Sequence, residues 1–236
     1  MARLGVHIEG AAWMRENLTK EIGPLALVIT AEMGGVDSIV VTLTENFHGI
    51  KKQDCTLLKS AVKTHLNFHT PVLEDTVQAA IEFRPDMVTL IPGKRPGASQ
   101  GGGVDILGQG GKLVKIIEEL RNAELITSVL VDPNVHQIKA AAKMGVDYVE
   151  LHLGEYAAIA DLNERADQFE NIKSVALAAA KLGLGVAAGQ GINYHNAAQI
   201  ASIAEIEEIN AGHAVLARAV LIGMEAAVRD MSALVH

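Results

Sequence analysis

The sequence predicts an α/β fold, a single (β/α)8 TIM barrel that spans residues 1–236 as one domain. Eight apolar runs of strand length alternate with segments of helical periodicity, and no linker-like stretch divides them. The last two units each pass from a strand through glycine into a helix, where barrels of this kind bind phosphate. Hydrophobic residues make up 49% of the chain and aromatic residues only 3%, which suits parallel strands covered by alanine-rich helices. A doubly wound open sheet is the alternative.

The predicted elements follow one another as repeated β–α units. Strands are expected at about 4–9, 38–43, 65–69, 86–91, 126–131, 146–152, 184–189 and 206–210. Helical periodicity is clear at Leu25–Met33, Leu73–Phe83, Leu113–Leu120 and Ile138–Met144, with later helices from about His195 and from about Val215 to Leu234. Glycine follows several predicted helix ends, as Gly145 does, and Asn134 is the expected N-cap of the helix after it.

One segment, residues 93–111, departs from this rhythm because it contains eight glycines. Such a sequence predicts a mobile loop after the fourth strand. Long loops in compact domains more often have a function than serve only as connections. A lid that closes on a substrate is therefore the favoured interpretation. A disordered connection is the alternative.

Charge and cysteine content narrow the class of protein. A formal net charge of -8 argues against a surface for nucleic acid or for membranes. The single cysteine, Cys55, excludes an intramolecular disulfide and fits a reducing compartment. Because Glu9 interrupts the first apolar run, no signal pattern is expected, and we predict a cytoplasmic protein.

Polar side chains alternate with apolar ones on three predicted strands. His7 and Glu9, Asn67 and His69, and Glu150 and His152 are each two residues apart, so each pair shares a face. These groups should point into the barrel near its C-terminal mouth, joined by Gln190 and Asn210 from the last two strands. A single buried histidine is usually a satisfied core residue, but the coincidence across strands favours a polar pocket.

Two glycine turns near the C-terminus have the form of phosphate sites. Gly189-Gln190-Gly191 and Asn210-Ala211-Gly212-His213 each connect a predicted strand to a helix. The N-terminus of a helix presents free backbone N–H groups, and glycine allows an anion to approach them closely.

Several segments resemble pyridoxine 5′-phosphate synthases along nearly the whole chain. The resemblance is clearest at residues 5–9, 91–95, 102–105, 150–157, 188–196 and 210–214. It implies a (β/α)8 barrel, a homo-octamer, no cofactor, and vitamin B6 synthesis through condensation of 1-deoxy-D-xylulose 5-phosphate with 3-amino-2-oxopropyl phosphate. Phosphorylated small molecules are therefore the expected ligands.

The resemblance also implies roles for individual residues. Gly191, Gly212 and His213 match the family's phosphate-binding positions, Arg15 matches an arginine after the first strand, and Glu150 and His152 match a Glu-x-His pair. Other positions depart from the family. Thr42, His69 and Gln190 stand where the family has its acid–base residues, and His7, Glu9 and Gly10 replace the polar residues of the family's first motif. Arginines of the family fall at Thr44 and Leu18. The residues assigned to catalysis are His69, Glu150, Gln190 and Thr42; those assigned to phosphate or substrate binding are His7, Glu9, Arg15, His152, Gly191, Gly212 and His213.

These departures leave two main hypotheses for function. Thr42 and Gln190 cannot titrate near neutrality, so the usual condensation needs a rebuilt acid–base set or gives way to a related reaction. A non-catalytic homologue that binds a phosphorylated ligand or a partner protein is the alternative, and an unrelated phosphate-binding barrel is a third. No metal site is assigned, although imidazoles of His7, His69 and His152 beside two carboxylates could in principle ligate Zn²⁺ or Fe²⁺.

Overall fold

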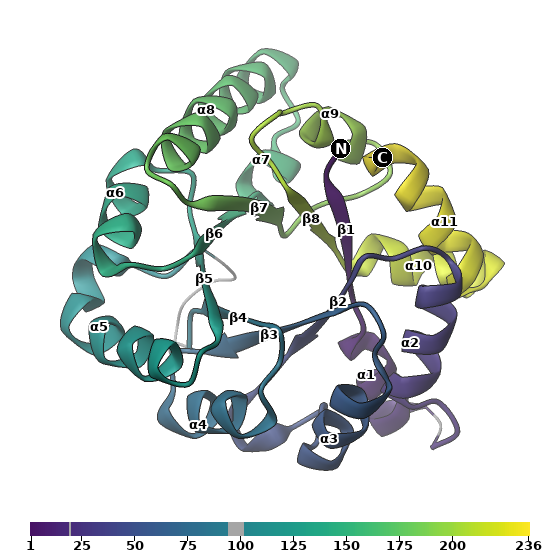
Figure 1. The fold of residues 1–236 in the computed structure, drawn as a ribbon. Coiled ribbons are helices and arrows are strands. Elements are labelled where there is room, and N and C mark those ends of the chain that lie inside the picture. Colours follow the sequence, from purple (N-terminus) through teal and green to yellow (C-terminus); the bar gives the residue numbers. More distant parts are fainter. Residues whose placement is uncertain (19, 94–101) are drawn as a thin grey trace.

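The computed structural model describes residues 1–18, 20–93 and 102–236. Eight parallel strands close into a barrel in sequence order, β1 to β8, and Figure 1 shows the helices arranged around them. The predicted (β/α)8 barrel is thus confirmed, and the open doubly wound alternative is wrong. The strands are β1 (Arg3–His7), β2 (Ser38–Thr42), β3 (His65–Pro71), β4 (Met87–Ile91), β5 (Ile126–Val131), β6 (Tyr148–His152), β7 (Gly185–Gly189) and β8 (Glu208–Ala211).

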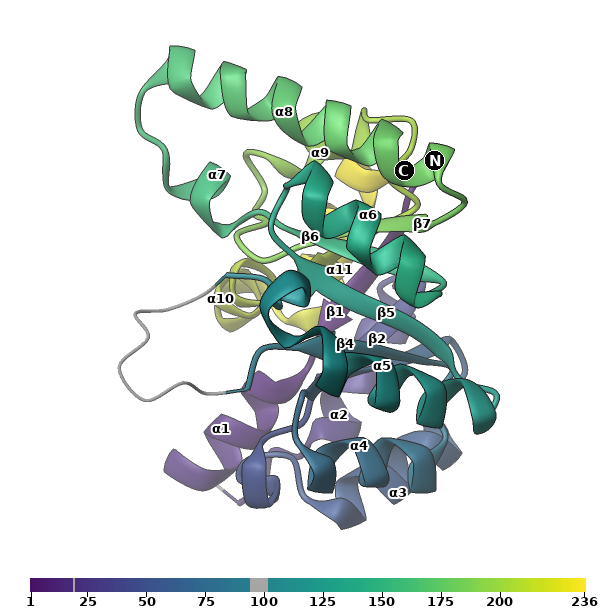
Figure 2. The ribbon, with the colours of Figure 1, turned by 90° about the vertical axis from the view of Figure 1, so that its left-hand side faces the viewer.

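The helices pack their apolar sides against the outer face of the strands. They are α1 (Glu9–Asn17), α2 (Pro24–Met33), α3 (Lys52–Ala61), α4 (Glu74–Phe83), α5 (Ile106–Asn122), α6 (Val135–Met144), α7 (Gly154–Ala158), α8 (Leu162–Lys181), α9 (Ala197–Ala201), α10 (His213–Ile222) and α11 (Met224–Val235), with a short 3₁₀ helix η1 (Glu45–Phe47). Within the described part of the chain, each helix is too short or too polar to cross a bilayer. Figure 2 shows α1, α7 and α10 at the same end of the barrel.

Local sequence signals fix several element boundaries. Asn134 caps α6 by accepting a hydrogen bond from the His136 N–H at 2.8 Å, and Gly145 ends that helix with a left-handed φ of 75°, both as predicted. The predicted last helix is in fact two, because Gly223 adopts a φ of 84° between α10 and α11. The helix expected from about His195 is confined to α9.

Two other boundaries differ from the prediction. The first strand ends at His7, and Glu9 begins α1 instead of ending the strand. In the glycine-rich segment, residues 94–101 lie outside the described residues, whereas residues 106–111 form the first turns of α5. Asp105 accepts a hydrogen bond from the Gly108 N–H at 3.0 Å, which caps that helix and ends the loop at residue 105.

An aspartate repeats at the N-terminal end of the barrel. Asp37, Asp86 and Asp147 stand just before β2, β4 and β6, and each carboxylate accepts a backbone N–H from the preceding strand, at 2.8, 2.8 and 2.9 Å respectively. The N–H of each aspartate in turn donates to a carbonyl of that same strand. These reciprocal bonds fix the register of three strand pairs.

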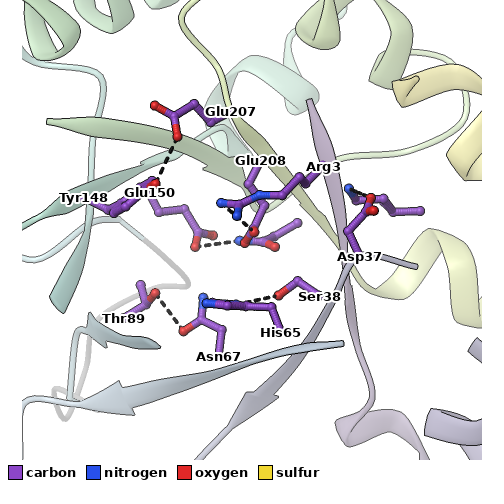
Figure 3. Close-up of polar contacts among 12 residues, drawn as sticks. Arg3, Asp37, Ser38, His65, Asn67, Thr89, Tyr148, Glu150, Glu207 and Glu208 are labelled. Carbon is purple, nitrogen blue, oxygen red and sulfur yellow. Dashed lines mark hydrogen bonds and ion pairs between the residues drawn. The ribbon is translucent and has the colours of Figure 1, made fainter. Parts of the chain in front are cut away.

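The barrel interior is unusually polar for this fold, whose interior is ordinarily filled by branched aliphatic side chains. Figure 3 shows part of this interior: Thr89 donates to Asn67 at 3.0 Å, and the carboxylate of Glu208 lies 3.4 Å from the Arg3 guanidinium. Glu208 is 1% exposed and its oxygens accept no hydrogen bond in the described structure. Burial raises the pKa of Glu208 to about 7; Arg3 opposes this rise and Glu150 adds to it.

This pKa predicts a pH-dependent stability. The folded state holds a proton on Glu208 that the unfolded chain loses at an ordinary pKa of 4.5. The resulting stabilisation is complete below that pH and is lost as pH rises through about 7, an effect of about 3 kcal/mol. We expect Glu208→Gln to match the parent near pH 5 and to unfold at higher urea concentration than the parent at pH 8. Glu207→Gln, at an exposed neighbour, is the control, and equal pH dependence in both variants would contradict the assignment.

Candidate functional site

A cavity of about 680 Å³ opens at the C-terminal mouth of the barrel. Its walls come from residues that end or follow β1, β7 and β8, together with the first turns of α1 and α10. Among the residues singled out from the sequence, it is lined by His7, Glu9, Gln190, Gly191, Asn210, Gly212 and His213. We refer to it as the mouth cavity.

His7 and Glu9 form an imidazole–carboxylate pair on one wall of this cavity. Nδ1 of His7 lies 3.0 Å from Oε1 of Glu9, and Thr42 donates its hydroxyl hydrogen to the same oxygen at 2.9 Å. The shared face was predicted from strand alternation, but the structure achieves it differently. Since β1 ends at His7, Glu9 reaches back to the imidazole from the first residue of α1.

A second pair lies behind the first and is fully buried. The His69 ring meets the His7 ring edge-on, with 4.8 Å between ring centroids, and Nε2 of His69 lies 3.1 Å from Oε2 of Glu150. Asn210 donates to that same carboxylate oxygen at 2.9 Å. A continuous set of polar contacts therefore leads from the mouth cavity into the barrel.

The charges in this set support one another. Burial acts against the charged form of His7, but the carboxylates of Glu9, Glu150 and Glu208 outweigh it and raise the imidazole's pKa above its ordinary 6.5. Burial likewise favours neutral Glu9, yet His7 and Thr42 hold the pKa of Glu9 at about 2. Against the same effect of burial, His69, His7 and Asn210 lower the pKa of Glu150. Near neutral pH the site thus combines ionised carboxylates with an imidazole that can donate a proton.

Glycines on neighbouring strands make room for this polar set. A Cβ added to Gly189 would lie 1.9 Å from Oε1 of Glu150, and a Cβ added to Gly5 would lie 1.9 Å from Oδ1 of Asn210. Both side chains occupy space that any other residue at these two positions would fill.

The two turns predicted to hold phosphate face the mouth cavity. Gln190 and Gly191 both have positive φ, 61° and 77°, and such backbone strain concentrates at functional sites. At the second turn, α10 begins at His213 directly after Gly212, with no side-chain cap and no acidic residue in its first turn. Its first backbone N–H groups therefore remain available to an anion.

Other predicted residues lie outside the lining of the cavity. Arg15, expected at a phosphate, donates instead to both carboxylate oxygens of Asp54 at 2.7 Å and to the Gly49 carbonyl at 2.9 Å. His152 is buried, with Nδ1 3.8 Å from an oxygen of Asp132. Thr42, His69 and Glu150 reach the cavity only through His7, Glu9 and Asn210.

The metal hypothesis for His7, His69 and His152 is not supported by their positions. Among the described residues, no group of three or more His, Cys, Asp or Glu side chains is arranged to hold a metal ion. His7 and His69 pair with separate carboxylates, and His152 faces Asp132.

Sequence reasoning missed one wall of the cavity, formed by Trp13 on α1 and Leu216 on α10. Trp13 follows Glu9 by four residues, a spacing that places both on one face of a helix. That signal was hidden because Glu9 was assigned to a strand.

Comparisons with known proteins agree with this architecture. The family model described as "Pyridoxal phosphate biosynthesis protein PdxJ" matches residues 4–236. Pyridoxine 5′-phosphate synthase of Geotalea daltonii is 39% identical over 236 residues, covering 100% of this chain and 99% of that protein. The enzyme of the same name from Geobacter metallireducens is 39% identical over 232 residues, covering 98% and 97%.

Solved structures with lower identity share the fold. Thiamine phosphate pyrophosphorylase from Pyrococcus furiosus superposes with a TM-score of 0.64 at 18% identity, covering 99% of this chain and 95% of that one. Phosphoribosylanthranilate isomerase from Thermotoga maritima gives a TM-score of 0.61 at 10% identity, covering 100% and 98%.

The protonation of His7 provides a direct test of the site. We expect histidine NMR signals of His7 to titrate above pH 6.5, and the pKa of His7 to fall in Glu9→Gln, which removes the nearest carboxylate. Glu16→Gln on the same helix is the control. An unchanged His7 pKa in Glu9→Gln, or an equal change in the control, would contradict the pairing.

Proposed function

The chain belongs to the PdxJ family of pyridoxal phosphate biosynthesis proteins, and from this we propose that it is a pyridoxine 5′-phosphate synthase-like enzyme with a rebuilt acid–base set. It binds a phosphorylated small molecule in the mouth cavity. Proton transfer to and from that molecule is assigned to His7 and Glu9, with His69 and Glu150 behind them.

The observation that supports this proposal is that one cavity is lined by an uncapped helix N-terminus and a glycine turn at one end and by an imidazole–carboxylate pair at the other. The α10 N-terminus and the Gln190–Gly191 turn form the first, and the His7–Glu9 pair forms the second. A phosphate held at the turns would leave the rest of a small substrate facing the imidazole.

The chemistry of the family requires such groups. Condensation of 1-deoxy-D-xylulose 5-phosphate with 3-amino-2-oxopropyl phosphate needs imine formation, enolisation, and loss of phosphate and water, and all of these steps move protons. A protonated imidazole with a raised pKa can donate a proton to a leaving oxygen. The same imidazole, now neutral, can then accept a proton. Thr42 and Gln190, at family acid–base positions, can only orient: Thr42 holds Glu9, and Gln190 shapes the turn beside the cavity.

Binding without turnover is the second candidate, and one contact favours it. The guanidinium of Arg15 is bound by Asp54 and is therefore withdrawn from a second phosphate. Loss of charge-assisted contacts of this kind weakens the binding of a two-phosphate reaction pair. In this case the protein would hold one phosphorylated ligand only.

Assembly, location and loop closure stay proposals. A homo-octamer is supported by family membership and by the exposed apolar residues Val220 and Leu221 on α10. A cytoplasmic location and a lid role for the glycine-rich segment follow only from the sequence arguments given above.

The anion site is tested by placing a carboxylate in it. Ala214→Asp adds a negative charge at the start of α10 without disturbing the helix, which tolerates acids in its first turn. We expect the affinity for inorganic phosphate, measured by calorimetry, to fall at least about tenfold, a loss of about 1.4 kcal/mol. Ala217→Asp, exposed on the same helix outside the cavity lining, should bind as the parent does. Equal affinities in the two variants would refute the site.

The reaction is tested with the two family substrates, by following phosphate release. A general acid–base group contributes about 10²–10⁴-fold, so we expect turnover below about 0.1 s⁻¹ against an ordinary value of about 10 s⁻¹. His7→Gln should abolish the remaining activity, whereas His48→Gln, exposed and outside the cavity lining, should not. Turnover near 1 s⁻¹, or activity that persists in His7→Gln, would show that other groups move the protons. Absence of release in the parent would favour the binding-only candidate.

A further inference from the structure

The imidazole of His7 uses only one of its two ring nitrogens within the described part of the chain. Nδ1 lies 3.0 Å from Oε1 of Glu9, and no described residue forms a hydrogen bond with Nε2. The side chain is only 9% exposed, yet it lines the mouth cavity. Polar atoms of buried side chains are nearly always paired, so the free nitrogen indicates a contact that a ligand would complete.

The free edge of this ring lies beside the start of α10. A Cβ added to Gly212 would lie 3.1, 3.5 and 3.7 Å from Cβ, Cγ and Cδ2 of His7. Cδ2 is bonded to Nε2, whereas Nδ1, on the opposite edge, faces Glu9. An anion held at the N-terminus of α10 would therefore border the nitrogen that has no partner.

The contact with Glu9 determines what Nε2 can offer to an anion. Against the effect of burial, His7 and Thr42 hold the pKa of Glu9 at about 2, so this carboxylate is ionised at neutral pH. Nδ1 must then carry a hydrogen in order to donate to it. In the neutral imidazole, Nε2 consequently presents a lone pair, which repels an anion. In the protonated imidazole both nitrogens carry a hydrogen, and Nε2 becomes a charged donor.

The charged and titratable groups around this imidazole come from α1, β3, β6, β8 and α10. They are Glu9, His69, Glu150, Glu208 and His213. Burial acts against the charged form of His7, but the carboxylates outweigh it and raise the imidazole's pKa above 6.5. Without that proton, an incoming anion would meet the ionised Glu9 with no positive charge on His7 beside it, and like charges repel.

We propose that a phosphate ester binds the mouth cavity together with a proton, which His7 carries between Glu9 and the phosphate. This inference rests on the proposed phosphate site at α10. Nδ1 donates to Glu9 and Nε2 donates to a phosphate oxygen, so the bound dianion holds the imidazole in its protonated form. The proton is taken up from solvent. Ligand binding thereby supplies the protonated imidazole that the proposed acid–base role requires.

The test uses inorganic sulfate, which stays a dianion across the pH range studied, at constant ionic strength. Hydrogen bonds to charged groups contribute about 10–100-fold to affinity. The affinity should be complete below the pKa of His7 and should be lost as pH rises through it. We therefore expect the sulfate affinity of the parent, measured by NMR titration, to fall at least about tenfold between about pH 6 and about pH 9. By reciprocity, saturating sulfate should raise the pKa of His7.

Three variants separate His7 from other sources of pH dependence. In His7→Gln the sulfate affinity should be nearly independent of pH. His213→Gln removes the other imidazole of the described cavity lining and should keep the pH dependence of the parent. Glu9→Gln removes the carboxylate nearest to His7 and should move the fall in affinity to lower pH. This last variant tests the coupling even where His7→Gln does not fold.

The outcomes distinguish the proton coupling from the anion site. Parent affinity that does not change with pH, or the same change in His7→Gln, would overturn the coupling while the anion site stands. Sulfate affinity that requires protonated His7 but is unchanged in Ala214→Asp would support the contact with His7 and overturn the site at α10. Sulfate that binds the parent at neither pH would overturn both.

Discussion

Closure of the sheet between its first and last strands is the constraint on which the site depends. β1 and β8 pair in register from Arg3 with Glu208 to Val6 with Ala211. That pairing brings the residues after each strand together, so that a Cβ at Gly212 would lie 3.1 Å from Cβ of His7. Two segments about two hundred residues apart thus form one cavity wall. An open sheet would leave the imidazole and the α10 N-terminus at opposite edges.

Within the closed barrel, carboxylates and imidazoles alternate, so that each of two carboxylates has an imidazole beside it. Glu9 and Glu150 flank the two imidazoles, and Thr42 and Asn210 each donate to the carboxylate oxygen that the neighbouring imidazole contacts. Removing one member would leave another charge buried without compensation, which usually costs more than the pair contributes. The acid–base pair that we propose for the cavity therefore lies on β1 and α1, whereas the resemblance to the family pointed to positions on other strands.

Periodicity and local caps were enough to predict the barrel, because eight strands, Asn134 and Gly145 each depend on residues near them in sequence. The His7–Glu9 pairing was also predicted, although through strand alternation instead of a helix start. The contact of Arg15 with Asp54 was not predicted, because the two residues are 39 positions apart and nothing in either segment signals the contact. The Trp13–Leu216 wall depends in the same way on how α1 and α10 pack, which no short-range pattern encodes.

The glycines beneath the buried carboxylate and amide have a consequence for comparing sequences. Gly5 and Gly189 are spaces in the strand surface that Asn210 and Glu150 fill from neighbouring strands. An alanine at either place would displace the group above it, so the four positions should change as two linked pairs during divergence. A relative that has lost one of these glycines should also have replaced the side chain it accommodates. The presence of both glycines would then mark chains that keep this buried charge, even where the residues facing the ligand have been exchanged.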